Sequence, residues 1–193
     1  RIFISSINSS ITEILGSGEV RPVVQRGLQW PLGLAVDSDG TVFVSDGVYG
    51  YNVKPGGDVS VDALQLAGMI FYPGCPGYMR GVVAGSAIGE WIVATGLGSI
   101  ARYRPALGES DFIAHGYDVL MGIDTNDKGA IIFAEYGAGK VHVAEGENIR
   151  ELASGLNKPM GVAVDGDTAY VAEAGAGRVV KISAGGTTEQ VAD

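Results

Sequence analysis

The chain has 193 residues, of which 46% are apolar, 31 are glycine and 7 are proline. This composition suits one large domain built from short strands and tight turns, and it argues against disorder. With 13 basic and 22 acidic residues the net charge is −9, so nucleic acid is an unfavourable partner because its phosphate backbone is also negative.

The sequence carries few signals of cellular compartment. No apolar run reaches the length of a membrane span, and no signal-peptide pattern opens the chain. Because the chain begins at Arg1 rather than methionine, we expect it to be processed, trimmed or a fragment, so that an export signal would have been lost. We expect a soluble protein, and secretion or a periplasmic location stays open. The single cysteine, Cys75, forms no internal disulfide.

From the N-terminus onward the chain predicts short strands joined by turns, with helix nearly absent. RIFISS, SITEIL and VRPVVQRG predict three strands in residues 1–29. Residues 30–70 predict four strands (LGLAVD, TVFVSD, YGYNVKP and VSVDALQLA). Four strands are also predicted in each of residues 71–117, 118–157 and 158–193.

These segments are copies of one unit. WPLGLAVDSDGTVFVSD, from Trp30 to Asp46, returns as PMGVAVDGDTAYVAE, from Pro159 to Glu173, and weaker copies lie between them. The copies align on a glycine in the first strand: Gly33, Gly81, Gly122 and Gly161. A strand-only repeat of roughly 40 residues is typical of a propeller blade. We therefore predict one all-β domain, a β-propeller of four-stranded antiparallel blades with about five blades and the first incomplete.

PLGLAVDSDGTVFVSD and PMGVAVDGDTAYVAEAGAGRVVKIS resemble the NHL-type repeat, in the broad group that includes gluconolactonase-like and streptogramin-lyase-like propellers. The resemblance implies blades around a central channel, usually six or seven of them. It also implies that lactonase-like members hold a divalent metal in the channel with carboxylates and an Asn, and that lyase-like members add a catalytic His. The group contains hydrolases, lyases and binding modules, so the resemblance does not choose among them.

Strand order predicts which residues meet at one end of the channel. In an up-and-down blade the fourth-to-first and second-to-third connections emerge together, and we call that side the mouth face. A channel mouth with aromatic and charged residues is a reasonable ligand site, although such residues also decorate ordinary loops. The predicted ligand-binding residues on the mouth face are Trp30, Tyr49, Tyr78, Arg80, Tyr117, Asp118, Tyr136 and Lys158.

Three carboxylates, Asp46, Glu135 and Glu173, share one position at the end of the second strand. If they converge on the axis, they would suit a hard cation such as Ca²⁺ or Mg²⁺. The alternative is structural: each would accept backbone N–H groups of a nearby glycine-rich loop. Recurrence at one repeat position favours this structural interpretation.

Other polar residues have simpler interpretations. Asp37, Asp39, Asn126 and Asp165 lie in predicted hairpins and are expected to form turns. His115 is the one histidine that we would test as an acid or base, because it precedes a connection on the mouth face, whereas His142 is expected in packing or at the surface. Cys75 has no nearby histidine partner in the sequence, and the Gly-Ala-Gly clusters precede strands, which argues against a phosphate loop.

Our leading functional interpretation is a non-catalytic propeller that binds a small molecule, protein or peptide at the mouth face. A divalent-metal-dependent hydrolase or lyase is the first alternative, with Asp46, Glu135 and Glu173 at the channel mouth. The second is a fragment of a longer multi-domain protein. We also expect the unpaired edge at RIFISS to be closed by further sequence or by an edge-to-edge homodimer. Gly122 and Gly161 should tolerate substitution poorly, because innermost strands crowd the axis.

Overall fold

The computed structural model describes residues 2–6, 10–28, 31–46, 49–55, 59–60 and 79–193, and for residues 49, 59 and 60 the backbone alone. The predictions for Trp30, Cys75, Tyr78 and the Tyr49 side chain therefore fall outside the described residues. Among the described residues the helical structure is one 3₁₀ turn, η1, and no helix is long and apolar enough to cross a membrane.

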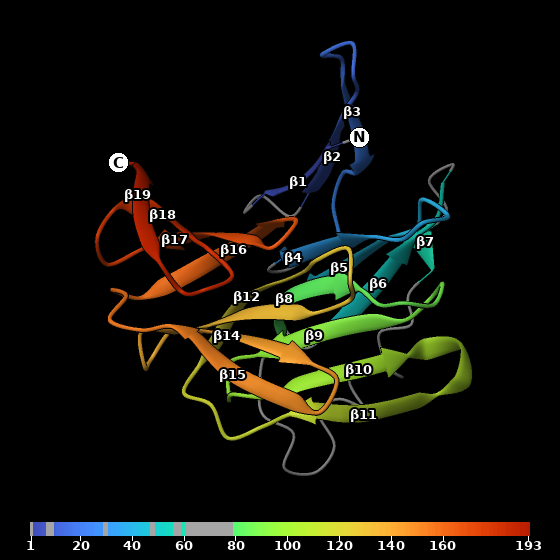
Figure 1. The fold of residues 1–193 in the computed structure, drawn as a ribbon. Coiled ribbons are helices and arrows are strands. Elements are labelled where there is room, and N and C mark those ends of the chain that lie inside the picture. Colours follow the sequence, from blue (N-terminus) through green and yellow to red (C-terminus); the bar gives the residue numbers. More distant parts are fainter. Residues whose placement is uncertain (1, 7–9, 29–30, 47–48, 56–58, 61–78) are drawn as a thin grey trace.

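The strands form five antiparallel sheets in chain order around a ring, as Figure 1 shows from blue to red. Among the described residues, the first sheet has three strands and the other four have four each. Blade 1 contains β1(Ile2–Ser6), β2(Ser10–Ile14) and β3(Val20–Val24). Blade 2 contains β4(Pro31–Val36), β5(Val42–Asp46), β6(Tyr49–Val53) and β7(Val59–Ser60). Blade 3 contains β8(Met79–Ala84), β9(Trp91–Thr95), β10(Ile100–Arg104), η1(Pro105–Leu107) and β11(Glu109–Ala114).

Blade 4 contains β12(Leu120–Thr125), β13(Ile131–Glu135), β14(Lys140–Glu145) and β15(Asn148–Ala153). Blade 5 contains β16(Pro159–Asp165), β17(Thr168–Glu173), β18(Arg178–Ile182) and β19(Thr188–Ala192). The predicted all-β propeller of about five blades, the first of them incomplete, is confirmed.

The core lies between blades rather than within one sheet. Four separate clusters of buried apolar side chains join blade 1 to 2, 2 to 3, 3 to 4 and 4 to 5. In the second of these, the rings of Phe43 and Trp91 stack with centroids 4.8 Å apart. Because alternate side chains of a strand point to opposite faces of its sheet, the second strands β5, β9 and β13 are buried on both faces.

The recurring glycines allow the innermost strands to approach one another. A Cβ on Gly33 would lie 2.6 Å from the carbonyl oxygen of Arg80, and one on Gly81 would lie 2.6 Å from that of Met121. A Cβ on Gly122 would lie 2.6 Å from both the Met160 oxygen and the Val162 nitrogen. The predicted crowding is therefore present wherever one inner strand is followed by another.

Blade 5 differs, and the expectation for Gly161 was wrong. A Cβ there would meet only Ala172 of the same sheet, at an ordinary 3.5 Å. The neighbouring strand β17 shows the same openness, because Thr168, Tyr170 and Ala172 on one of its faces are half-buried or exposed. The physical reason is that, among the described residues, no inner strand packs beside Gly161 on the side away from blade 4.

Asp37, Asp39 and Asn126 form hairpin turns through their side chains, as predicted, whereas Asp165 is the last residue of strand β16. Oδ1 of Asp39 accepts the backbone N–H of Thr41, and Oδ1 of Asn126 accepts those of Lys128 and Ala130. Asp37 has a second role, since its Oδ2 accepts the backbone N–H of Gly89 in the next blade at 2.6 Å. These turns lie at the end of the propeller opposite the mouth face.

Candidate ligand-binding face

The mouth face of blades 4 and 5 is built by one repeated backbone arrangement. In blade 4, the N–H groups of Tyr136 and Gly137 donate to the carbonyls of Val119 and Asp118. In blade 5, the N–H groups of Ala174 and Gly175 donate in the same way to Lys158 and Asn157. Val119 and Lys158 both adopt φ of 54°, which is uncommon outside glycine and turns the incoming chain sharply into the inner strand.

The carboxylates of Glu135 and Glu173, at the ends of β13 and β17, hydrogen-bond to the backbone of these turns. Glu135 pairs with Leu120 in the sheet register and Glu173 with Pro159, so the two glutamates occupy equivalent positions. Oε1 of Glu135 accepts the backbone N–H of Asp118 at 2.8 Å, and Oε1 of Glu173 accepts that of Asn157 at 2.6 Å. Each glutamate is therefore engaged with the chain that enters its own blade.

The second oxygen of each glutamate meets a nitrogen side chain from the third strand. Oε2 of Glu135 lies 2.7 Å from Nε2 of buried His142, and Oε2 of Glu173 accepts the Arg178 Nε–H at 2.5 Å. Burial alone would raise the pKa of Glu173. The hydrogen bonds from Arg178 and the Asn157 backbone, with the charge of Arg178, outweigh burial and lower that pKa below its ordinary 4.5.

In blades 2 and 3 the same repeat position is occupied by Asp46 and Thr95, which pair with Pro31 and Met79 in the same register. Both are buried. The hydroxyl of Thr95 donates to the backbone carbonyl of Ser99 and accepts the backbone N–H of the same residue. Among the described residues, no group of three or more His, Cys, Asp and Glu side chains lies close enough to share a metal ion. Asp46, Glu135 and Glu173 are thus not gathered into one cluster.

The remaining predicted residues of the mouth face divide into exposed and packed groups. Asp118 and Lys158 are exposed, and Lys158 Nζ lies 6.0 Å from the ring centroid of half-buried Tyr136, which links blades 5 and 4. Tyr117 instead packs edge-on against Phe133 and His142. Burial, and then the charge of Glu135, raises the pKa of Tyr117. His115 is exposed just beyond β11.

The axial channel is lined mainly by apolar residues, whereas its mouth carries charged and aromatic ones. A cavity of about 370 Å³ is lined by the four inner strands β4, β8, β12 and β16. Its described lining contains leucine, valine, isoleucine, methionine and glycine, with Arg80 as the charged member. No carboxylate or histidine lies among the described lining residues.

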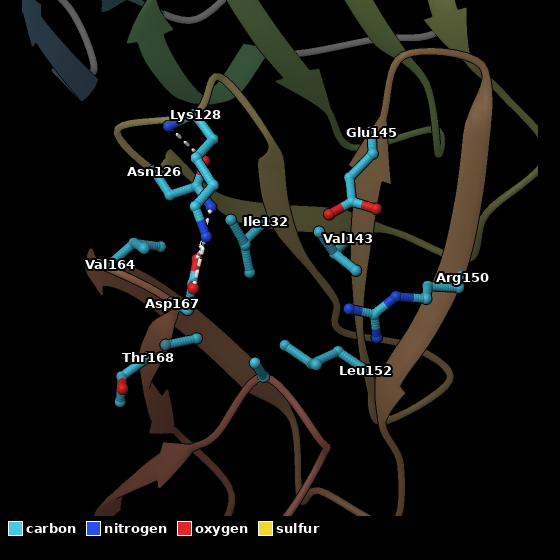
Figure 2. Close-up of a pocket in the computed structure, with 13 residues that line it drawn as sticks. Asn126, Lys128, Ile132, Val143, Glu145, Arg150, Leu152, Val164, Asp167 and Thr168 are labelled. Carbon is cyan, nitrogen blue, oxygen red and sulfur yellow. Dashed lines mark hydrogen bonds and ion pairs between the residues drawn. The ribbon is translucent and has the colours of Figure 1, made fainter.

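A smaller pocket of about 140 Å³ lies between blades 4 and 5 (Figure 2). On one side, Lys128 Nζ bonds both oxygens of Asp167, at 2.8 and 2.6 Å, which ties the two blades together. Glu145 and Arg150 stand on the other side, as Figure 2 shows. The hydrogen bond from Asp167, and then its charge, raises the pKa of Lys128. Because its lysine is already paired, we do not place the candidate site here.

Sequence reasoning missed the partners of the two glutamates. Arg178 lies directly opposite Glu173 in the register, and Lys140 lies opposite Glu135. The parallel between GAGK and AGAGR would have predicted both pairs. Only the Arg178–Glu173 pair forms, since Lys140 bonds Glu151 at 2.9 Å and His142 takes the place of Lys140 beside Glu135.

Comparison with solved structures identifies the fold. A chain from a nidogen–laminin complex matches with a TM-score of 0.80 and 16% identity, over 99% of this chain and 77% of that one. A provisionally assigned gluconolactonase matches with a TM-score of 0.75 and 14% identity, over 98% and 72%. The virginiamycin B lyase of Staphylococcus aureus matches with a TM-score of 0.71 and 14% identity, over 96% and 64%. The chain has the fold of these propellers.

The similarity extends to the fold and not to the sequence. No protein-family model matches the chain, and no curated protein sequence matches it. The chain spans less than two thirds of the length of the lyase structures that it matches. The resemblance predicted from the repeats is confirmed as a shared propeller, among whose structural neighbours are both enzymes and a chain from a protein complex.

Proposed function

We propose that this propeller is a non-catalytic binding module that receives its ligand at the mouth face and in the channel beneath it. The observation that carries the proposal is the engagement of Glu135 and Glu173. Each is buried, accepts a backbone N–H of its own incoming chain, and meets His142 or Arg178 with its second oxygen. A carboxylate held in this way is a structural acceptor, because each of its two oxygens already has a protein partner.

The exposed and half-buried residues of the mouth face support the binding half of the proposal. Tyr136, Lys158, Asp118 and Asn157 are grouped around the loops that the two glutamates hold in place. Aromatic and charged side chains on a rigid β scaffold are well suited to recognition, because little conformational freedom is lost when a ligand binds. The match to a chain of the nidogen–laminin complex makes a protein or peptide ligand a reasonable occupant.

The alternative proposal is a hydrolase or lyase that depends on a divalent metal such as Ca²⁺ or Mg²⁺. The likeness of the fold to a lyase and a gluconolactonase favours it. It would require Asp46, Glu135 and Glu173 to act as metal ligands and His115 or another group to act as acid or base. For Glu135 and Glu173, metal binding would first break the bonds to Asp118, His142, Asn157 and Arg178.

A hydrolysis assay separates the binding proposal from the hydrolase form of the alternative. The parent and Glu173→Gln would be mixed with a δ-lactone in the presence of Ca²⁺ or Mg²⁺, and ring opening would be followed by proton release. We expect the rate of buffer alone for both proteins. Metal-dependent turnover by the parent that Glu173→Gln abolishes would contradict the binding proposal.

The binding half is tested by protection from lysine acetylation with a panel of short peptides and small amphiphiles. Ligands at the mouth face should protect Lys158 and leave Lys128, at the opposite end, unchanged. Equal protection of both lysines, or of neither by any member of the panel, would contradict the proposed face.

The ring also offers a place for a further protein partner. Ile2 and Ile4 of β1 are 61% and 46% exposed, and blade 5 leaves one face of β17 uncovered. Exposed apolar strands beside an unpaired edge invite pairing with another sheet. We propose that further sequence of a longer protein, or a second copy of this chain, covers these surfaces.

A further inference from the structure

We propose that the axial channel binds a small amphipathic carboxylate, a molecule with one anionic head group and an apolar body, and that Arg80 anchors the head group. This inference rests on the proposed binding function and adds the chemical class of the ligand. It follows from the ring of side chains around the channel and from the state of the one charged residue in that ring.

The ring consists of four equivalent residues, each immediately before the recurring glycine of its inner strand: Leu32, Arg80, Met121 and Met160. Leu32 and Met160 are exposed although they are large and apolar, and all four line the channel cavity. Three positions therefore contribute apolar residues to the channel lining, and the fourth contributes a half-buried arginine.

Among the described residues, Arg80 differs from three other arginines of the chain in having no carboxylate partner. Arg102 and Arg104 both pair with Glu90, and Arg178 pairs with Glu173. In the part of the chain that the structure describes, no carboxylate pairs with Arg80. Its buried Nε has no hydrogen-bond partner among those residues; the Nε of Arg102 also has none, but it lies 3.7 Å from a Glu90 oxygen. A half-buried cation left without a partner is costly, so an anion that reaches it gains a strong and otherwise unused interaction.

The surroundings of Arg80 restrict that anion. A guanidinium binds a carboxylate through two parallel N–H bonds, and a single cation balances a single negative charge. The apolar ring members contribute only if the ligand also brings apolar surface, because their stabilisation comes from removing that surface from water. A cavity of about 370 Å³ falls within the range that accommodates small organic ligands. Together these features favour a monocarboxylate with a hydrocarbon body over an inorganic anion or a cation.

The test is titration calorimetry of the full chain with octanoate, and with octanol and octylammonium as probes of the same length but different charge. Arg80→Met is the informative variant, since methionine occupies the equivalent positions in β12 and β16. Arg150→Met, at an exposed arginine outside the channel, is the matched control. A urea titration of each variant confirms that it is folded.

We expect saturable octanoate binding by the parent and by Arg150→Met, and at least a tenfold loss, about 1.4 kcal/mol, in Arg80→Met. Octanol should bind both arginine variants equally. Octanoate binding that Arg80→Met leaves unchanged, that octylammonium matches, or that is weaker than about 1 mM in the parent would overturn the inference. Unchanged binding in Arg80→Met, or equal binding of octylammonium, would contradict only the assignment of the ligand class and not the proposed binding function. Metal-dependent turnover in the lactone assay would contradict the binding function itself.

Discussion

Nε2 of His142 lies 2.7 Å from Oε2 of Glu135, across two neighbouring strands of blade 4, and both residues are buried. The histidine ring also stacks on Phe133, with centroids 5.1 Å apart, and meets Tyr117 edge-on. The other oxygen of Glu135 holds the N–H of Asp118 on the mouth face. Packing inside the blade is thus connected, through one carboxylate, to the shape of the proposed binding surface.

Removal of the histidine should destabilise blade 4. In His142→Leu the apolar contacts remain, but Oε2 of Glu135 loses its partner in a buried site, which costs about 1–3 kcal/mol. The control is His115→Leu, whose histidine is exposed. Urea denaturation should show a loss for the first variant only. Equal stability of the two variants would contradict a structural role for the Glu135–His142 pair.

The inner-strand glycines should respond unequally to the same substitution. Gly122→Val forces a side chain to within 2.6 Å of the backbone of blade 5, and we expect a loss of about 1–3 kcal/mol or more. Gly161→Val meets only Ala172, so its free energy of unfolding should stay close to that of the parent. Urea titration of both variants makes the comparison. A large loss in Gly161→Val would mean that another inner strand covers this position.

The Glu173 carboxylate should stabilise the fold in a pH-dependent way. Because its pKa is lower in the folded chain than the ordinary 4.5, its contribution is complete above that value and disappears as the pH falls through the folded pKa. Glu173→Gln should therefore be less stable than the parent at neutral pH, and the difference should shrink in acid. Urea titrations between pH 7 and 3 measure this, with exposed Glu147→Gln as the control. A difference that does not vary with pH would rule out the charged pair.

The uncovered surfaces of blades 1 and 5 predict the association state. If a second copy covers Ile2, Ile4 and the open face of β17, light scattering will show a mass that rises with protein concentration. Ile4→Lys should then return the chain to the monomer, because a charge is costly to bury. A strict monomer at all concentrations would exclude the second copy and leave further sequence as the covering partner.

The sequence was sufficient to predict the propeller because copies of the repeat place the same residue types at equivalent positions in the strands and turns. Gly33, Gly81 and Gly122 recur where inner strands meet, and Asp39 and Asn126 recur where hairpins turn. The turns are a local requirement of the backbone, and the glycines meet a requirement that returns wherever the next blade packs alongside, so the copies of the unit repeat both. Gly161 shows the limit of this reasoning. Its crowding depends on a neighbouring blade, which the repeat itself does not record.

The mouth face was less predictable, for a related reason. The shared position of Glu135 and Glu173 was visible in the sequence, together with the alternative that they accept backbone N–H groups. Their partners were not, because His142 reaches Glu135 from a diagonal position while Lys140, directly opposite, turns to Glu151. The identity of a side-chain partner is decided by packing between strands. Periodicity in one strand does not contain that information.

The central claim, that Glu135 and Glu173 hold the mouth face together and do not hold a metal, is tested most directly by thermal unfolding with added ions. The parent and Glu173→Gln would be stripped with a chelator and melted with increasing Ca²⁺ or Mg²⁺. A cation bound only to the folded state, at a hundredfold excess over its Kd, would raise the Tm by roughly 5–10 °C in a domain of this size. We predict no rise for either protein and a lower Tm for Glu173→Gln in metal-free buffer. A rise of that size in the parent, abolished in Glu173→Gln, would contradict the claim and favour the metal-dependent enzyme.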